Sequence, residues 1–396
     1  MDWVKIDVEG AELHVLRGFE NDITRFKPKI IIEVKEFNRK GVFEFFKEVN
    51  YACHHIPEDE SGEYFHMRAE ELVSIIIPTL NEEENIERVI KSIMIQDYRP
   101  LEVIIVDGGS KDGTLKIVER IKREASSESF MLHVLTEHGE CRSPANAKNI
   151  GFASARGAYV LFIDADYVLL DHDFISKVAK ALEGSPWVSV RLIPIEGKSN
   201  LISLAQVVMN RTWAPEGYVN ERRCFKREFL ESNANPPFDP CLGVGEDAYL
   251  VHKLKSKGFT PTFVDVRLGD VVPFDLRRFV RRYEWYGRTV LRFYAGVHNF
   301  SRLRALVNAL WDNKGVWITI IYPMLFTLLY LWLGSIGLFI GLSLYASLRI
   351  RFFIKVPVKS LRILMAISLL DIVRSASYLY GLLKGFIGLC AKVSRD

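Results

Sequence analysis

The chain has 396 residues, of which 49% are hydrophobic and 26% are charged. This composition excludes a disordered or collagen-like chain, and the length allows two or three domains. The 52 basic and 49 acidic residues nearly cancel, so net charge gives no reason to expect nucleic acid as a partner. The five cysteines are widely spaced, without a CxxC pair. This pattern predicts neither a disulfide framework nor a zinc site, and it favours a reducing compartment.

The N-terminal segment, residues 1–70, is predicted to be a small α/β unit. It lacks the long apolar run of a signal peptide, so we expect the N-terminus to stay in the cytoplasm. The stretch from Trp3 to Gly18, with Lys27 to Val34 after it, resembles the C-terminal part of FkbM-type methyltransferases. In that family the glycine-rich loop for S-adenosylmethionine lies upstream, and we expect this chain to lack it. A strand, a helix and a strand cannot easily bury a core alone. We therefore expect a remnant packed on the next domain, or half of a split gene.

Residues 71–270 are predicted to form an α/β domain. Three of its four strand patterns are continuous apolar runs, as expected for buried parallel strands. The alternation of strands and helices predicts a doubly wound sheet, whose ligands bind beyond the carboxyl ends of the strands. The predicted strands are 73–78, 102–107, 131–135 and 159–164, and the predicted helices are 84–95, 114–124 and 144–155.

Polar residues follow the first two predicted strands. The first strand leads into PTLNEEENI, with Pro78, Thr79 and Glu82, and the second leads into VDGGSKDGT, with Asp107. Glycines let a backbone approach a ligand closely, and the following helix N-terminus offers free N–H groups. Asp107 is a candidate to accept hydrogen bonds from a base or ribose. An ordinary strand-to-helix turn, with Asp112 near a helix cap, explains the same residues.

Two further acidic pairs are candidates for chemistry. Asp164 and Asp166 end the fourth strand, and carboxylates one residue apart can share a Mg²⁺ or Mn²⁺ ion that bridges to phosphate. Glu246 and Asp247 precede an amphipathic helix pattern that ends at Gly258. The second pair either complements the helix dipole or supplies a general base.

The order of PTLNEEENI, VDGGSKDGT, ANAKNIG, FIDAD and GEDAYLVHKLKSKGF resembles the family 2 glycosyltransferases, over residues 73–290. The resemblance implies the GT-A fold and inverting transfer of a sugar from a nucleotide-diphosphate sugar, with Mn²⁺ or Mg²⁺. The processive polysaccharide synthases of this family carry QxxRW, which the sequence lacks. The resemblance therefore implies a non-processive enzyme that adds a single sugar. No motif marks a further metal ligand, for which Asp265 and Asp270 are the candidates.

The resemblance also implies roles for the motif residues. Asp164 and Asp166 would hold the nucleotide and the metal, and Asp247 would be the catalytic base, with Glu246 beside it. Lys148 stands where the family often has an arginine, and we expect it to face the diphosphate as a point charge. The residues expected to contact the nucleoside are Pro78, Thr79, Glu82 and Asp107.

Residues 271–312 are predicted to form Arg-rich amphipathic helices close to a membrane. Between Arg277 and Arg304 lie eight arginines and one acidic residue, Glu284, interleaved with aromatic side chains. Such a stretch suits anionic lipid headgroups on the cytoplasmic side of a membrane. A solvated basic helix without a specific ligand has the same composition.

Residues 313–396 are predicted to form a transmembrane helical region. The stretch Gly315 to Leu348 has no charge, which predicts a tight helical hairpin turning near Gly334, or one long tilted span. A second apolar stretch, 361–389, contains Asp371 and Arg374, which share a helix face and are expected to pair inside a bundle. The alternative is an amphipathic helix lying on the membrane. Spacing that favours close helix packing occurs at Gly337 and Gly341 and at Gly381 and Gly385.

Together these patterns predict an α/β chain with a GT-A doubly wound sheet, a C-terminal transmembrane helical region and a small N-terminal α/β segment. They predict a multi-pass cell-membrane protein with a cytoplasmic catalytic domain. Its predicted partners are a nucleotide sugar, the membrane and a lipid-linked glycan or polyprenyl phosphate acceptor, and not nucleic acid. The alternatives are a methyltransferase-related protein and a membrane scaffold with an inactive transferase domain. Asp107, Asp166 and Asp247 at one predicted sheet edge favour the active transferase.

Overall fold

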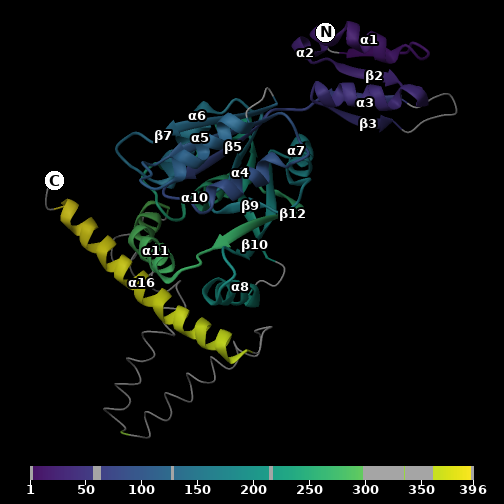
Figure 1. Cartoon of the computed structure of the whole chain (residues 1–396). Coiled ribbons are helices and arrows are strands. Elements are labelled where there is room, and N and C mark those ends of the chain that lie inside the picture. Colours follow the sequence, from purple (N-terminus) through teal and green to yellow (C-terminus); the bar gives the residue numbers. More distant parts are fainter. Residues whose placement is uncertain are drawn as a thin grey trace.

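The computed structural model describes residues 3–56, 64–125, 129–213, 217–297, 334 and 360–393. A four-stranded sheet organises the N-terminal residues, and an eight-stranded sheet organises the middle of the chain (Figure 1). Figure 1 shows the small sheet and its helices set apart at one end, and a long C-terminal helix at the other. The predicted apolar hairpin at 315–348 and the pair Gly337 and Gly341 lie outside the described residues, apart from Gly334.

The N-terminal unit has the strand order β1-β2-β4-β3 and a core of its own. Leu16, Ile30 and Phe45 are fully buried in that core. The expectation that this segment lacks a core is wrong, because one more helix and two more strands follow the strand–helix–strand pattern. Its elements are β1 (Trp3–Ile6), α1 (Glu12–Gly18), α2 (Glu20–Phe26), β2 (Lys29–Glu33), α3 (Arg39–Glu48), β3 (Tyr51–Ile56) and β4 (Tyr64–Ala69).

The large sheet has the order β7-β6-β5-β8-β11-β10-β12-β9. The four strands β7, β6, β5 and β8 are parallel, as predicted, whereas β11 runs antiparallel to β8 and β10, and β9 runs antiparallel to β12. The sheet is therefore mixed, and its second half was not predicted. Its strands are β5 (Val73–Thr79), β6 (Leu101–Asp107), β7 (Phe130–Thr136), β8 (Tyr159–Phe162), β9 (Tyr167–Leu169), β10 (Trp187–Glu196), β11 (Tyr218–Lys226) and β12 (Thr262–Val272).

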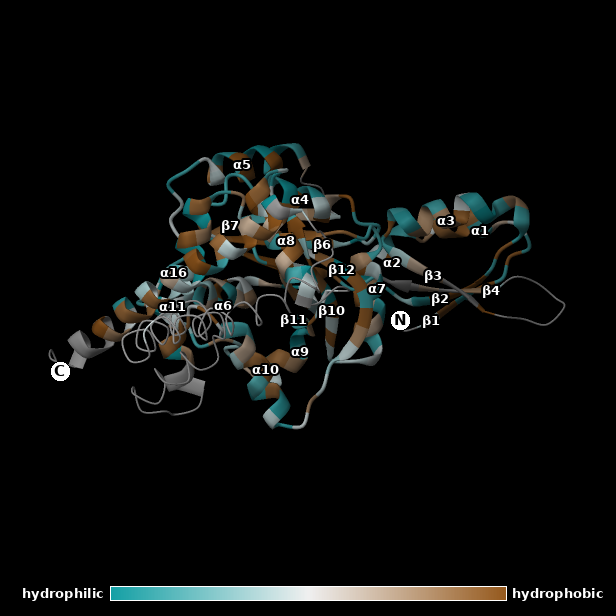
Figure 2. Cartoon of the chain, turned by 90° about the horizontal axis from the view of Figure 1, so that it is seen from below, coloured by the Kyte–Doolittle hydropathy of each residue, from teal (hydrophilic) through white to brown (hydrophobic). Residues whose placement is uncertain are grey.

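Helices cover both faces of this sheet, which is why β5 and β6 read as continuous apolar runs. The side chains of α4, α5 and α7 join the core on one face, and those of α6, α9 and α10 join the core on the other. Figure 2 shows hydrophobic colour on central strands near β6 and both hydrophilic and hydrophobic colour along helices such as α5. The helices are α4 (Ile86–Met94), α5 (Thr114–Ala125), α6 (Pro144–Ser154), α7 (Phe174–Gly184), α9 (Arg227–Asn233) and α10 (Glu246–Ser256).

Three helices form a layer below the sheet: α8 (Leu201–Trp213), α11 (Leu276–Val297) and α16 (Leu361–Val393). The helices α11 and α16 approach so closely that a Cβ atom at Gly381 would overlap the carbonyl oxygen of Glu284. A Cβ atom at Gly287 would likewise overlap the carbonyl oxygen of Tyr378. The close packing predicted from the spacing of Gly381 and Gly385 is therefore confirmed, and its partner is α11.

The helix α16 is the one helix among the described residues that is long and apolar enough to cross a membrane, at Arg362–Ile387. Asp371 and Arg374 pair on it at 2.6 Å, as predicted. Lys384 also reaches across to Glu284 of α11 at 2.8 Å. One face of α16 is thus occupied by protein, including charged groups, while other side chains remain exposed.

The glycine contact between α11 and α16 yields a test. Gly381→Ala should destabilise the protein by about 2–3 kcal/mol, because the added methyl group meets rigid backbone and forces the helices apart. The matched control is Gly184→Ala, since Gly184 also lies in a helix but faces open space. That change should be neutral or stabilising by up to about 1 kcal/mol. Equal effects of both changes on denaturant unfolding would contradict the contact.

Candidate functional site

The predicted site residues meet at the carboxyl edge of the parallel half of the large sheet. Thr79 at the end of β5 pairs with Asp107 at the end of β6, and β8 lies on the other side of β5. β8 ends at Phe162, two residues earlier than predicted, so Asp164 and Asp166 lie in the turn that leads to β9. The sequence prediction that these motifs share one edge is confirmed.

The first two loops of this edge are tied to each other. The buried carboxylate of Asp107 accepts hydrogen bonds from the backbone N–H groups of Gly109 at 2.9 Å and Ser110 at 3.0 Å. The side chain of Asn81 accepts a bond from the N–H of Lys111 at 2.8 Å. Thr79 is buried and donates to the carbonyl of Ile77. Thr79 and Asp107 therefore shape their own loops, beside the half-buried Pro78.

A cluster of buried charges lies behind this edge. Lys148 of α6 is fully buried and contacts Asp164 at 3.1 Å and Glu246 at 2.8 Å. Arg223 of β11 contacts Asp164 at 2.8 Å and Asp247 at 3.4 Å. Exposed Arg222 adds a contact to Asp247 at 3.3 Å. Three carboxylates are therefore balanced by three cations, and we call these six residues the rear cluster.

The pKa values in the rear cluster follow from burial and pairing. Burial opposes ionisation of Asp164, but the charges of Arg223 and Lys148 outweigh it and hold the pKa of Asp164 well below its usual value. Burial likewise opposes ionisation of Asp247, yet Arg223 and Arg222 lower its pKa. Burial raises the pKa of Glu246, against the Lys148 charge. Asp164 and Asp247 are thus held as carboxylates.

Lys148 differs from its sequence expectation. We expected its ammonium group to face a diphosphate, but the group is fully buried between Asp164 and Glu246. The reason is that α6 packs against β5 and β6, where Gly151 is so close to Ile76 that a Cβ atom would overlap that side chain. This packing directs Lys148 into the protein, where it pairs with two acidic side chains.

A second set of charges lies at the open side of the edge, and we call it the front cluster. Asp166 forms an ion pair with Arg282 of α11, and Asp270 of β12 lies 3.9 Å from the same guanidinium. Asp166 and Asp270 are neighbours because the N–H of Val271 donates to the carbonyl of Asp166 across the β9–β12 pairing. Glu82, held by Asn85 at 2.8 Å, completes the cluster.

The front cluster carries three carboxylates and one cation, unlike the balanced rear cluster. Burial raises the pKa of Asp166 to about 8, with Asp270 and Glu82 adding to the rise and Arg282 opposing it. Burial also raises the pKa of Asp270 and of Glu82. The Oδ1 atom of Asp270 is buried and accepts no hydrogen bond from any described residue. Three carboxyl groups around one guanidinium group offer hard oxygen ligands that fit one divalent cation such as Mg²⁺ or Mn²⁺, and a bound cation would displace their protons.

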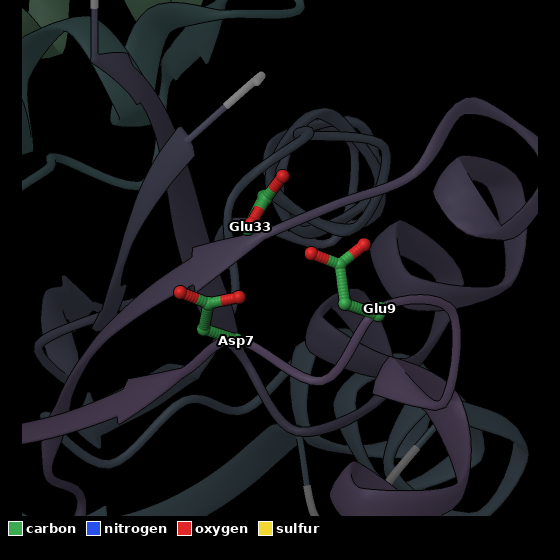
Figure 3. A group of neighbouring side chains, drawn as sticks. All are labelled: Asp7, Glu9 and Glu33. Carbon is green, nitrogen blue, oxygen red and sulfur yellow. The ribbon is translucent and has the colours of Figure 1, made fainter. Parts of the chain in front are cut away.

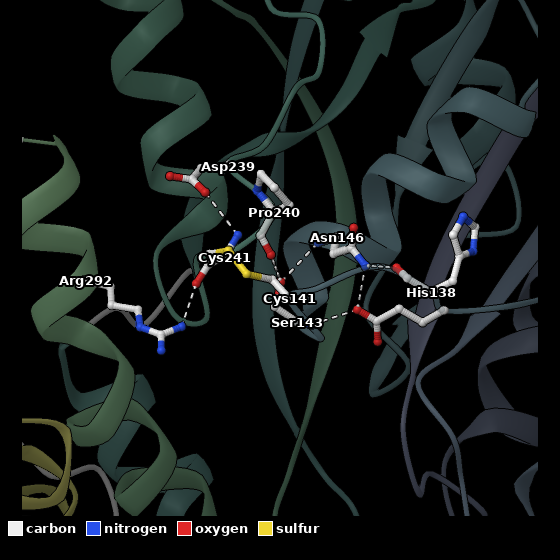
Figure 4. The surroundings of a disulfide bond; sticks show 9 residues. His138, Cys141, Ser143, Asn146, Asp239, Pro240, Cys241 and Arg292 are labelled. Atoms are coloured by element: carbon white, nitrogen blue, oxygen red, sulfur yellow. Dashed lines mark hydrogen bonds between the residues drawn. A yellow bond between two sulfur atoms is a disulfide. The ribbon is translucent and has the colours of Figure 1, made fainter. Parts of the chain in front are cut away.

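The loop that precedes Glu246 and Asp247 is fixed from two sides. Figure 4 shows a disulfide between Cys141, before α6, and Cys241 in this loop. Ser143 also donates to the carbonyl of Pro240 at 2.6 Å. From the other side, the Thr289 hydroxyl of α11 accepts a bond from the N–H of Val244 at 3.1 Å.

The disulfide corrects the sequence analysis, which predicted no such link. The two cysteines are 100 residues apart in sequence, with a Cα–Cα distance of 5.1 Å. Spacing along the chain cannot reveal a pair that forms only when the loops before α6 and α10 meet. Of the other described cysteines, Cys53 and Cys224 are free thiols.

Two residues of the site, Arg223 and Arg282, were not predicted from the sequence with a role. Arg223 lies in the unpredicted strand β11, and Arg282 belongs to the stretch that we assigned to membrane contact. Asp270 was considered only as a metal ligand without a motif, whereas Asp265 is exposed and pairs with Arg191 at 2.8 Å. The segment RRYEW at residues 281–285 is the signal that could have drawn attention to Arg282.

The N-terminal unit carries a separate acidic group. Asp7, Glu9 and Glu33 have carboxylate oxygens within 4.8 Å of one another (Figure 3). Lys5 contacts Asp7 at 3.2 Å, and Lys35 contacts both Glu9 and Glu33. These two lysines offset most of the negative charge, and we assign no ion to this group.

Comparison with protein families gives two matches. Residues 74–241 match the family model described as glycosyl transferase family 2. Residues 1–56 match the model described as methyltransferase FkbM domain. Both matches confirm the resemblances found from the sequence, in the same order along the chain.

Curated relatives cover the middle of the chain. A GalNAc(5)-diNAcBac-PP-undecaprenol beta-1,3-glucosyltransferase of Campylobacter jejuni is 29% identical over 166 residues, which are 42% of this chain and 50% of that protein. The UDP-Glc:alpha-D-GlcNAc-diphosphoundecaprenol beta-1,3-glucosyltransferase WfaP of Escherichia coli is 34% identical over 96 residues, 24% of this chain and 36% of that one. The chain thus spans half or less of the length of these relatives.

A solved structure shows the same fold. The mannosyltransferase PcManGT of Pyrobaculum calidifontis, in complex with GDP-Man and Mn²⁺, aligns with a TM-score of 0.50 and 18% identity. The alignment covers 95% of this chain and 98% of that chain. The likeness concerns the fold, and it agrees with a mixed α/β, GT-A-like sheet.

The rear cluster yields a stability test. Lys148→Met should cost about 3–5 kcal/mol of unfolding free energy, because it leaves Glu246 buried without its cation. The double variant Lys148→Met, Glu246→Gln should recover a large part of that loss, since it removes the uncompensated charge. Chemical denaturation of the three proteins measures both effects. A loss below about 1 kcal/mol for the single variant would show that Lys148 is not the balancing charge.

Proposed function

We propose that this chain, whose residues 74–241 form a family 2 glycosyltransferase domain, is an inverting, metal-dependent and non-processive transferase. In this proposal it moves one sugar from a nucleotide-diphosphate sugar to a membrane-associated acceptor. The observation that carries the proposal is the contrast between the two charge clusters. The rear cluster is balanced and orients Asp247, while the front cluster gathers three carboxyl groups around the Arg282 guanidinium group. Such a site suits a divalent cation and the diphosphate that it binds.

The front cluster would bind the donor. Asp166 and Asp270 would hold a Mn²⁺ or Mg²⁺ ion, with Glu82 nearby. When bound, this ion would neutralise the negative charge that develops on the departing nucleoside diphosphate. Asp164 would stay with Lys148 and Arg223 and support the turn that carries Asp166. Pro78, Thr79 and Asp107 would line the nucleoside end, at the neighbouring strand termini.

Asp247 would act as the general base. Its carboxylate would accept the proton of the acceptor hydroxyl as that oxygen attacks the anomeric carbon, and the bond from that carbon to the diphosphate would break. One in-line displacement of this kind inverts the configuration. The pairing with Arg223 and Arg222 keeps Asp247 ionised and oriented. Glu246, engaged with Lys148, would fix the start of α10.

The proposed acceptor is a lipid-linked glycan or polyprenyl phosphate. The names of two relatives include undecaprenol-linked diphosphate substrates. In this chain, a depression of about 290 Å³ on α11 is lined by Arg281, Glu284, Trp285 and Arg288. Two guanidinium groups and an indole ring suit a phosphate group attached to an apolar chain.

A methyltransferase-related function, favoured by the match of residues 1–56, is the second candidate, and an inactive scaffold is the third.

The proposal includes attachment to the cytoplasmic face of the cell membrane. The uncharged residues 315–348 would enter the bilayer, which would make the protein multi-pass if they form a hairpin. For α16 we propose a position in the plane of the membrane surface. The apolar side chains on its outer face are about 49–65% exposed, and they are Met365, Leu369, Ile372, Tyr380, Leu383 and Ile387. This stripe extends for about 33 Å at 1.5 Å per residue.

The inner face of α16 argues against a crossing. It packs on α11, whose exposed arginines include Arg281 and Arg288. A spanning α16 would carry that helix into hydrocarbon, at about 2.5–3.5 kcal/mol for each arginine on insertion scales. An in-plane helix keeps these arginines at headgroup level and gives its apolar stripe to the acyl chains.

Two variants test the catalytic assignment. Asp247→Asn should lower sugar transfer at least about 100-fold, because the amide cannot accept the proton. It should still bind nucleoside diphosphate with Mn²⁺. Asp166→Asn should instead abolish the Mn²⁺-dependent thermal stabilisation by nucleoside diphosphate, which is about 2.7 kcal/mol at one hundred times the dissociation constant. Loss of binding in the Asp247 variant, or retained stabilisation in the Asp166 variant, would contradict the assigned roles.

Spin labels test the position of α16. Labelled cysteines at Met365, Ala376 and Ile387 lie three turns apart on one exposed face. For an in-plane helix, oxygen accessibility should give the same shallow depth at all three positions in proteoliposomes. For a spanning helix, position 376 should lie about 16 Å deeper than the other two.

The background protein would have Cys53 and Cys390 replaced by serine, and an exposed label at Ser256 would give the aqueous reference. If the labels at positions 365, 376 and 387 are all as accessible to water as the label at position 256, α16 does not contact the membrane. A deep label at position 376 alone would restore the spanning prediction.

A further inference from the structure

In the front cluster, Arg282 pairs with Asp166 and lies 3.9 Å from Asp270. We propose that its guanidinium group occupies the position of the divalent cation until cation and donor bind together, and that Arg282 then transfers to the donor diphosphate. Arg282 would thus couple cation binding to donor binding. This inference rests on the proposed function, because it concerns the cation and the donor of that reaction.

The geometry of Arg282 resembles that of a bound cation. One guanidinium nitrogen pairs with Oδ2 of Asp166, and another lies 3.9 Å from Oδ1 of Asp270. One carboxylate comes from the turn that leads to β9 and the other from β12, which pairs antiparallel with β9, so one group bridges the two residues proposed as metal ligands. The Arg282 side chain is only about one quarter exposed. The contact is therefore part of the packed site and not a surface ion pair.

Arg282 and a metal ion would compete for the same atom. A divalent cation bonds to carboxylate oxygen at about 2.0–2.2 Å, a distance that leaves no room for a guanidinium nitrogen on the same lone pair. Arg282 must therefore leave Oδ2 of Asp166 when the ion binds there. Lys148 and Arg223 cannot take its place, since both are engaged with the rear cluster.

A displaced Arg282 would be left with fewer negative partners. The cation would use the charge of Asp166 and Asp270, whereas a bound diphosphate would bring new negative charge to the same spot. A guanidinium fork matches two phosphate oxygens well. Arg282 therefore has a new anionic partner only when the donor is present. Without the donor, the cation must compete with Arg282 for Asp166.

The helix α11 stays in place during this exchange. Thr289 and Phe293 lie seven and eleven residues after Arg282, on the same face of α11. Thr289 bonds the loop before Asp247, and Phe293 packs so closely on Gly245 that a Cβ atom there would lie 2.7 Å from its ring. The exchange is therefore a side-chain movement of Arg282 on a fixed helix.

Binding of Mn²⁺ measured by electron paramagnetic resonance tests the proposal without enzyme activity. Without nucleotide, Arg282→Gln should bind Mn²⁺ at least about tenfold more tightly than the native protein, the size expected for removal of one charge-assisted hydrogen bond. Addition of GDP or UDP should strengthen Mn²⁺ binding strongly in the native protein and much less in the variant, because coupling of this kind is reciprocal.

The matched control is Arg278→Gln. Arg278 lies one turn earlier on α11 and pairs with Glu84 and Asp275, not with Asp166. Its replacement should leave Mn²⁺ affinity within about twofold of the native value. Arg282→Lys, which retains the charge but not the fork, should give an intermediate affinity. It also serves as the second variant if Arg282→Gln lowers the melting temperature strongly.

The outcomes separate this inference from the proposed function. In one outcome, the native protein binds Mn²⁺ with nucleotide, but Arg282→Gln binds Mn²⁺ no more tightly than the native protein does. This outcome overturns the competition between Arg282 and the cation, and it leaves the transferase proposal intact. Absence of Mn²⁺ binding in every protein, with or without nucleotide, overturns both. Equal gains in Arg282→Gln and Arg278→Gln would indicate a general charge effect, and would also overturn the role of Arg282.

Discussion

Burial of charge at the carboxyl edge of the large sheet is the constraint on which the rest of the site depends. The two cores of the sheet bury three carboxylates, those of Asp164, Glu246 and Asp247. Without partners, these carboxylates would lower the free energy of unfolding. Lys148 and Arg223 offset them from α6 and β11. The turn after β8 and the start of α10 are thereby held together. The groups proposed for catalysis are oriented because the fold requires their partners.

The helix α11 joins this edge to the outside of the molecule. One of its faces gives Arg282 to the front cluster and Thr289 to the loop before Asp247. Its other side meets α16 at backbone distance through Gly287 and Gly381. Anything that acts on α16, including a membrane surface, therefore acts on a helix that contacts both halves of the proposed site. The disulfide between Cys141 and Cys241 limits movement of the same loop from the opposite side.

The parts of the fold that the sequence predicted well are those with local causes. The strands β5 and β6 are apolar on both faces because helices cover both. The helix α6 is capped by Ser143, whose side chain accepts a hydrogen bond from the N–H of Asn146. The strands β9 to β12 pair antiparallel or across long separations, and their half-exposed patterns carry little periodic signal. The N-terminal core was missed for a similar reason, since β4 joins β2, and β3 joins β4, from beyond the recognised segment.

The sequence by itself determined the family resemblance, the order of the motifs and their place at one sheet edge, because apolar strands must end where polar residues begin. It also determined that Asp371 and Arg374 share a helix face. Only the tertiary structure decided which charges are balanced. It directed Lys148 inward, brought Arg223 and Arg282 to carboxylates 59 and 116 residues away, and joined two cysteines across 100 residues. These pairings depend on how strands and helices pack, and a local pattern of residues does not predict that packing.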